Sequence, residues 1–160
     1  MEPVDVSAPV RATLELLEPQ IQARQIRLRH VADGTPRPVL GNASQLQQLF
    51  HNLCLNAIEA MNGGGELSVR VADLTEARGI TLIVEVSDTG PGIPEDLLPR
   101  IFNPFVTTKA RGSGLGLAIC SSIADAHRAR LRARNNTERS GSTFTVEFPV
   151  ITEQAARVSA

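Results

Sequence analysis

Two glycine-rich segments, each at the junction of predicted elements, constrain this chain most strongly. Asp88-Thr89-Gly90-Pro91-Gly92-Ile93 follows a predicted strand, and Gly112-Ser113-Gly114-Leu115-Gly116-Leu117 opens a predicted helix. A carboxylate beside a glycine turn can accept a hydrogen bond from a polar ring edge, and a glycine-rich helix N-terminus can wrap phosphates with backbone N–H groups. Each motif alone is weak, because glycine turns are common. Their order, with an asparagine-bearing helix upstream, makes the combination specific.

The spacing of apolar residues predicts an α/β fold of the α+β type, arranged as a two-layer sandwich. The predicted strands follow one another through tight turns, which favours a mixed, mainly antiparallel sheet of about five strands with three helices on one face. Helices are expected over Pro9–Gln25, Asn42–Met61, Glu95–Ile101 and Gly114–Ala126, and strands over Arg27–Val31, Pro38–Leu40, Glu66–Leu74, Gly79–Asp88, Arg128–Arg134 and Ser142–Val150.

Two of the helices have clear inward faces. Asn42 is a candidate N-cap for the helix that ends at Met61, and the last helix begins at Gly114 after a loop without apolar period over Asn103–Ser113. The inward residues are expected to be Leu46, Leu49, Phe50, Leu53, Ala57, Ile58 and Met61 in the first helix, and Leu115, Ala118, Ile119, Ile123 and Ala126 in the last.

Composition narrows the class of protein. A chain of 160 residues fits a single domain, with a core from about residue 4 to 150 and a frayed tail over 152–160. A net charge of −1 argues against binding to nucleic acid or to a membrane surface. Cys54 and Cys120 fall in predicted helices, which is typical of buried free thiols in a reducing compartment, so we expect a cytoplasmic domain. Two Asn-X-Ser/Thr triplets, one at Asn135, carry no weight there.

Strand parity brings two polar side chains to the edge of the core. Asp88 continues the apolar face of the strand over Gly79–Asp88, and Ser142 begins the inner face of the last strand. One interpretation is that Asp88 only caps the turn at Thr89-Gly90. The alternative is that Asp88 accepts a hydrogen bond from an exocyclic amine such as that of adenine, with the Ser142 hydroxyl completing the polar site.

Three further groups of residues have both a functional and a structural interpretation. Asn52, Asn56 and Glu59 lie beside the apolar stripe of their helix, either as a solvated edge or with amide oxygens facing a Mg²⁺-phosphate. Lys109 is the only lysine and precedes the second glycine segment, so it is a candidate phosphate contact, with Arg111 as the second. Alternating arginines at 128, 130, 132 and 134 indicate a solvated or edge-protecting stripe, and less readily a docking surface for an acidic partner.

Four segments together resemble the ATP-binding catalytic domain of sensor histidine kinases, within the wider Bergerat-fold group of type II topoisomerase, Hsp90-like and MutL-like ATPases. The resemblance extends from about Val4 to Pro149. In chain order, the Asn box is His51–Ala57, the first Gly box Asp88–Ile93, the Phe box Phe102–Lys109 and the second Gly box Gly112–Leu117.

This resemblance implies a nucleotide site and a flexible lid over Asn103–Ser113. It implies that Asp88 reads adenine, that Asn56 holds Mg²⁺, and that Lys109 and Gly114–Gly116 hold the phosphates, with Asn52 and Lys109 as the catalytic residues. The full set of expected ATP contacts is Asn52, Asn56, Asp88, Gly90, Gly92, Ile93, Lys109, Gly112, Gly114, Leu115, Gly116, Leu117 and Ser142.

One position separates kinases from ATPases within this resemblance. Related ATPases carry a glutamate general base where this chain has Asn52, which cannot abstract a proton, so transfer of the γ-phosphate is favoured over hydrolysis. In kinases of this type the acceptor histidine is followed by Glu or Asp and lies on a separate dimerisation domain. None of the three histidines here is followed by an acidic residue. The acceptor is therefore expected on a separate dimerisation domain of the same parent protein, which forms a homodimer. Glu59 departs from the family pattern, where a lysine is frequent.

The resemblance also implies partners and leaves alternatives. A response regulator receiver domain is expected to take the phosphoryl group onward, and the parent protein could be membrane-anchored. The alternatives are a serine kinase of the anti-sigma type, a related ATPase, and an interaction module that no longer binds nucleotide.

Overall fold

The computed structural model describes residues 1–34, 37–107 and 113–151, and the elements below are those of these ranges. The tail expected to fray, 152–160, lies outside them. In chain order the elements are β1 (Glu2–Val4), α1 (Ser7–Ala23), β2 (Ile26–Ala32), β3 (Val39–Gly41), α2 (Ala43–Ala60), β4 (Gly65–Glu76), β5 (Gly79–Ser87), the 3-10 turn η1 (Leu98–Arg100), α3 (Gly116–Ala126), β6 (Arg130–Asn135) and β7 (Ser142–Pro149).

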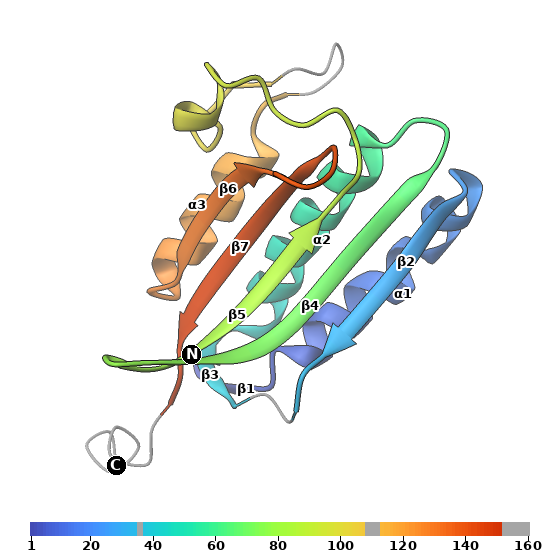
Figure 1. Ribbon diagram of the computed structural model, residues 1–160. Helices are drawn as coiled ribbons and strands as arrows, with labels where there is room; N and C mark the ends of the chain where they lie inside the picture. Colours follow the sequence, from blue (N-terminus) through green and yellow to red (C-terminus); the bar gives the residue numbers. More distant parts are fainter. Residues whose placement is uncertain (35–36, 108–112, 152–160) are drawn as a thin grey trace.

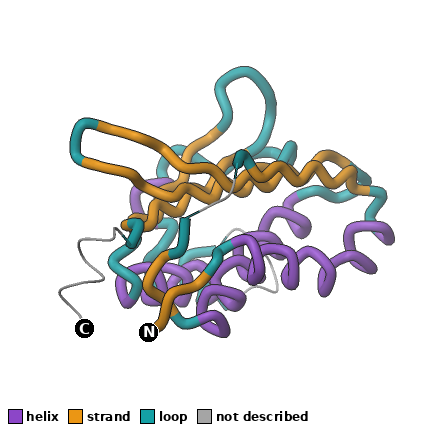
Figure 2. Tube along the Cα trace, turned by 90° about the horizontal axis from the view of Figure 1, so that it is seen from below, coloured by secondary structure: helices purple, strands orange, loops and turns teal. Residues whose placement is uncertain are grey.

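The helices and the main sheet form two layers, as the sequence predicts. The five-stranded sheet has the order β2-β4-β5-β7-β6, in which β2 pairs with β4 in parallel and the other pairs are antiparallel. Figure 1 shows α1, α2 and α3 behind one face of this sheet, and Figure 2 shows the same two layers edge-on. Among the described helices, none combines the length and the apolarity that crossing a membrane requires.

A second, smaller sheet was not predicted. The strand expected at Pro38–Leu40 is β3, and it pairs antiparallel with β1, apart from the main sheet. Three-residue strands are too short to show an alternating pattern, so no local signal marks β1 or its pairing. This small sheet lies just before α2, and it brings the chain to the residue that caps that helix.

Helix α2 has the form that the sequence predicts. The Asn42 side chain accepts a hydrogen bond from the Gln45 amide at 3.1 Å, which satisfies one of the unpaired N–H groups at the helix start. All seven residues of its predicted stripe are buried against the sheet and α1: Leu46, Leu49, Phe50, Leu53, Ala57, Ile58 and Met61. Phe50 meets Phe148 of β7 edge-to-face at 6.3 Å between ring centroids.

Two helix predictions need correction. In α3 the buried residues are Cys120, Ile123 and Ala124, whereas Leu115 is 37% and Ile119 38% exposed and Ala126 is exposed as well. The apolar stripe of α3 is wider than its contact with α2 and β6, so part of it faces outward. The helix expected over Glu95–Ile101 is only η1, because Pro99 lies inside that segment and cannot donate a backbone hydrogen bond.

Candidate functional site

A cavity of about 460 Å³ lies between α2, the segment that follows β5 and the start of α3. Its volume is within the usual range for sites that bind small molecules. Nine of the residues predicted to contact a nucleotide line it: Asn52, Asn56, Asp88, Gly92, Ile93, Gly114, Gly116, Leu117 and Ser142. Four segments that are distant in the sequence therefore meet at one hollow.

The remaining predicted contacts either do not line the cavity or lie outside the described residues. Gly90 is buried and does not line the cavity, and Leu115 lies on the outward apolar face of α3. Lys109, Arg111 and Gly112 lie outside the described residues. The lid predicted over Asn103–Ser113 is therefore described only at its two ends, where the Phe105 amide donates to the Gly114 carbonyl at 2.9 Å.

Asp88 is buried at the end of β5, on the same face as Leu82, Val84 and Val86, as strand parity predicts. Its Oδ1 accepts from the Gly90 amide at 2.9 Å and from the Ser142 amide at 3.3 Å, and its Oδ2 accepts from the Ser142 hydroxyl at 3.0 Å. A carboxylate offers about four acceptor positions, so these bonds leave one position, on Oδ2, for a ligand donor. Asp88 therefore caps the turn and also lines the cavity, and its contact with an exocyclic amine stays a prediction.

The turn after Asp88 is pressed against the end of α2. A Cβ atom on Gly90 would lie 2.7 Å from the carbonyl oxygen of Ala60, so only glycine permits this close approach. Beside it, the buried Met61 sulfur accepts from the Thr89 amide at 3.4 Å. These contacts bring the first Gly box to the end of the helix whose flank carries the asparagines.

Helix α2 presents a half-buried polar flank to the cavity, formed by Asn52, Asn56 and Glu59. The Asn52 Nδ2 donates to the carbonyl of Gly116 at 3.4 Å. Asn52 therefore ties α2 to the start of α3 in addition to lining the cavity. This second contact was not predicted from the sequence.

Helix α3 begins at the cavity. Its first backbone N–H groups, at Gly116 and Leu117, have no intrahelical partners and carry the positive end of the helix dipole. Among the described residues, the cavity wall carries the carboxylates of Glu59 and Asp88 and neither lysine nor arginine. The polar helix start is thus the feature of this wall that suits an anionic group.

The two cysteines belong to the packing between α2 and α3. Burial raises the pKa of both Cys54 and Cys120 to about 12. At neutral pH both thiols are therefore protonated and cannot act as nucleophiles or soft metal ligands. Within residues 1–34, 37–107 and 113–151, no three His, Cys, Asp or Glu side chains gather in a way that could hold a metal ion.

Sequence reasoning missed the residues that support the Asp88–Ile93 loop from the other side. Asn135 and Asn136 hydrogen-bond backbone groups of this loop from a distance of more than forty residues along the chain. Their only local signal was a pair of asparagines where a strand meets a turn, and a glycosylation triplet was the only pattern recognised there.

The chain matches the family described as histidine kinase-, DNA gyrase B- and HSP90-like ATPase over residues 41–152. It is 39% identical to the sensor histidine kinase TmoS of Ectopseudomonas mendocina over 152 residues, which is 94% of this chain and 16% of TmoS. It is 35% identical to the sensor histidine kinase ZraS of Escherichia coli K12 over 150 residues, covering 94% of this chain and 31% of ZraS. The chain thus spans less than a third of either relative.

The fold is also that of solved histidine kinase catalytic domains. The nucleotide-free catalytic domain of the histidine kinase ThkA superposes with a TM-score of 0.81 at 32% identity, covering 94% of this chain and 97% of that domain. ThkA in complex with the response regulator protein TrrA superposes with a TM-score of 0.77 at 30% identity, covering 93% of this chain and 41% of that chain.

Proposed function

Because the chain belongs to the family of histidine kinase-, DNA gyrase B- and HSP90-like ATPases, we propose that it is a single ATP-binding catalytic domain of a sensor histidine kinase. In this role it binds ATP-Mg²⁺ and presents the γ-phosphate to a histidine on a separate domain. The reaction is phosphoryl transfer, in which catalysis consists mainly of positioning the reactants and stabilising charge.

The observation that carries this proposal is the hydrogen bonding of Asp88. Three internal donors hold its carboxylate still and leave one acceptor position on Oδ2. The exocyclic amine of adenine is a donor that fits this position, and guanine presents an acceptor at the equivalent place. Selectivity for adenine would therefore follow from a carboxylate that is fixed before the nucleotide arrives.

The phosphate end would lie along α2 and the start of α3. The backbone N–H groups of Gly116 and Leu117 suit phosphate oxygens, and the Asn56 amide oxygen suits one position in a Mg²⁺ shell otherwise made by phosphates and water. When bound, Mg²⁺ would offset phosphate charge beside a wall whose charged side chains, among the described residues, are all carboxylates. Lys109, which we propose contacts the phosphates, would add a second cation from the lid.

Asn52 supports a kinase over an ATPase. Its amide cannot take a proton from water, and its Nδ2 is engaged with the Gly116 carbonyl at 3.4 Å. A water molecule beside the γ-phosphate would therefore lack a general base at this position. The phosphoryl group would remain available for an acceptor that a partner supplies.

The partner surface lies next to the cavity. Phe105 is 75% exposed, and Leu115 and Ile119 form an exposed apolar strip along α3. Exposed apolar side chains next in sequence to residues that line a site suit a protein partner. We propose that the acceptor is a histidine-bearing dimerisation domain of the same parent protein, acting as a homodimer in the cytoplasm. A receiver domain would then take the phosphoryl group, in line with the complex of ThkA with a response regulator.

Phosphoryl transfer in a reconstituted system tests this proposal. The chain is mixed with labelled ATP-Mg²⁺ and with the dimerisation domain of its parent protein, and acid-labile label on the acceptor is followed over time. We expect label on the acceptor histidine, none when that histidine is replaced by glutamine, and none with the Asp88→Asn chain at low ATP. Acid-stable label on serine would indicate the anti-sigma type of kinase instead, and rapid phosphate release without any labelled protein would indicate an ATPase.

A further inference from the structure

The first Gly box is held from outside the cavity by the turn that joins β6 to β7. Asn135, the last residue of β6, makes two hydrogen bonds to the backbone of Ile93: its Oδ1 accepts from the amide at 2.7 Å, and its Nδ2 donates to the carbonyl at 2.8 Å. A planar amide that pairs with both groups of one residue fixes that residue much as a neighbouring strand would.

The next residues of the turn complete the attachment. Asn136 Nδ2 donates to the Asp88 carbonyl at 3.0 Å, and its own Oδ1 accepts from the Thr143 hydroxyl at 2.6 Å. The Ser140 hydroxyl donates to the carbonyl of Gly90. Figure 1 shows this turn beside the segment that leaves the end of β5.

These bonds fall on the backbone groups that most need partners. The loop from Asp88 to Ile93 contains two glycines and has no regular secondary structure, so no ladder would otherwise satisfy its carbonyls. The carbonyls of Asp88, Gly90 and Ile93 all accept from the β6–β7 turn. The distant turn therefore supplies partners for three carbonyls of this loop.

Asn135 and Asn136 do not line the cavity themselves. Ile93 and Gly92, next to the Asn135 amide, do line it, and so does the Asp88 side chain. Any effect of the two asparagines on a bound nucleotide would thus pass through the loop. The effect would be preorganisation, since a loop that is already ordered loses less conformational entropy on binding.

We propose that Asn135 and Asn136 are positioning residues for nucleotide binding, which hold the Asp88–Ile93 loop in its ligand-ready form. This inference rests on the proposed function, because it takes the cavity to be the ATP site. In this proposal the β6–β7 turn increases the affinity for the nucleotide, and Asp88 sets the selectivity for adenine. A purely structural role would lower the stability of the fold and leave the affinity of the folded chain unchanged.

The test measures ATP-Mg²⁺ and GTP-Mg²⁺ affinity by calorimetry for the whole chain and for Asn135→Ala. We expect ATP affinity to fall about tenfold, as for the loss of one to two hydrogen bonds, with the preference for ATP over GTP retained. Asn135→Asp keeps the acceptor for the Ile93 amide and loses the donor, so its affinity should be intermediate. Thr137→Ala, an exposed residue of the same turn, is the matched control and should bind as the parent chain does.

Hydrogen exchange shows whether the loss of order is confined to the loop, and the affinity of the folded chain separates the positioning role from a structural one. In the nucleotide-free chain, the Ile93 amide should exchange faster in Asn135→Ala, while amides of α2 and β4 keep their protection. If the parent chain binds ATP and a folded Asn135→Ala chain binds it equally well, the positioning role is overturned. If the parent chain binds no ATP, the proposed function itself fails. Should Asn135→Ala not fold, Asn136→Ala carries the same comparison.

Discussion

At the residue scale, the site depends on polar groups that are satisfied before a ligand arrives. Asp88 receives its donors from Gly90 and Ser142, and Asn52 is tied to Gly116. Buried polar groups are costly unless they are paired, so a site built in this way is rigid as well as polar. Burial also makes Cys54 and Cys120 chemically inert, because it keeps both thiols protonated.

Both thiols should stay protonated in the folded chain at neutral pH. Since burial raises the pKa of Cys54 and Cys120 from 9.0 to about 12, the folded chain keeps both protons over a pH range in which the unfolded chain loses them. This contribution to stability is complete below pH 9 and is lost as the pH rises toward 12. We expect the free energy of unfolding to fall across that window, and less steeply in Cys54→Ala.

Labelling provides the direct check on this point. At pH 8 a thiol reagent should modify neither cysteine in the native chain and both in urea, because labelling then requires unfolding. Modification of the native chain at the rate of a free thiol would contradict the buried position of the pair.

At the element scale, α2 combines two functions on adjacent faces. Its apolar stripe is buried against the sheet and α1, and its polar flank forms one wall of the cavity. The two faces meet because residues three and four apart share a side of a helix. Substitutions on the two faces should therefore have separable effects.

Leu53→Ala and Asn56→Ala are the matched pair for α2. Leu53 is fully buried, so its truncation should cost roughly 2–5 kcal/mol of stability through the cavity it leaves. Asn56 is half-buried at the cavity wall, so Asn56→Ala should keep its stability and lose the Mg²⁺-dependent part of ATP affinity. Urea denaturation and calorimetry separate the two. Unfolding of Asn56→Ala to the same degree as Leu53→Ala would show that Asn56 is part of the core.

The end of α3 contains a position where the backbone is strained. Arg128 follows the helix with φ +54°, a left-handed conformation that favours glycine. Arg128→Gly should therefore raise the free energy of unfolding by roughly 1 kcal/mol. Arg130→Gly, in the extended strand β6, is the control and should lower it, because glycine weakens a strand. A loss of stability in Arg128→Gly would mean that the arginine side chain contributes more than the strain costs.

The elements differ in how far the sequence determines them. The α2 stripe and the β4–β5 hairpin are long and periodic, and both were predicted closely. The β1–β3 sheet is too short to show a period, and the outward turn of Leu115 and Ile119 depends on where α3 packs. Asp88 and Ser142 were found because strand parity is local. Asn135 was not found, since its partner Ile93 is 42 residues away and no local pattern marks such a pair.

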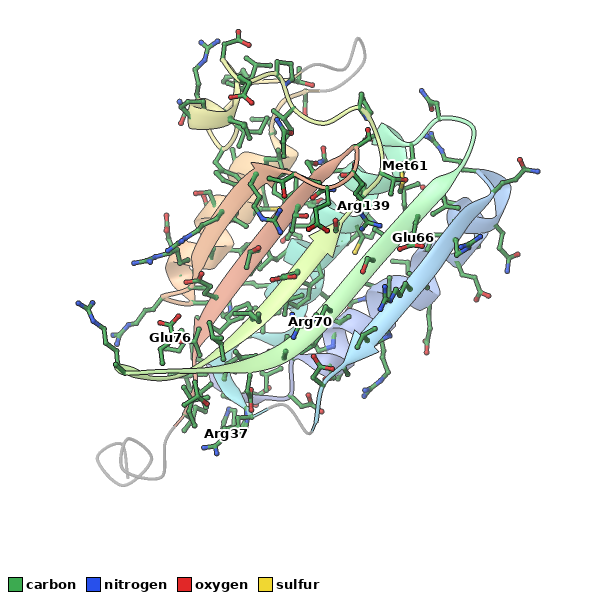
Figure 3. All side chains as sticks on the ribbon, in the orientation of Figure 1. Arg37, Met61, Glu66, Arg70, Glu76 and Arg139 are labelled. Carbon is green, nitrogen blue, oxygen red and sulfur yellow. The ribbon has the colours of Figure 1, made fainter. Side chains whose placement is uncertain are left out.

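At the scale of the whole molecule, the two-layer arrangement leaves one face of the sheet open and places the site at one end. The ion pair Arg70–Asp33, at 3.0 Å, is exposed, and the pair Arg139–Glu66, at 3.3 Å, is partly exposed. Figure 3 shows Arg70, Arg139 and Glu66 on the open side. Exposed pairs of this kind contribute about 0–1 kcal/mol each. Stability therefore rests on the core between the layers, and the loops at the end of the sheet are left to form the cavity.

The central claim is that this cavity selects ATP through Asp88. Calorimetric titration of ATP-Mg²⁺ and GTP-Mg²⁺ into the chain and into Asp88→Asn tests it most directly. We expect the parent chain to prefer ATP, and Asp88→Asn to lose on the order of 1.5–3 kcal/mol of ATP binding and most of that preference, because the lost bond is charge-assisted. Equal ATP affinity in Asp88→Asn and the parent chain would contradict the claim.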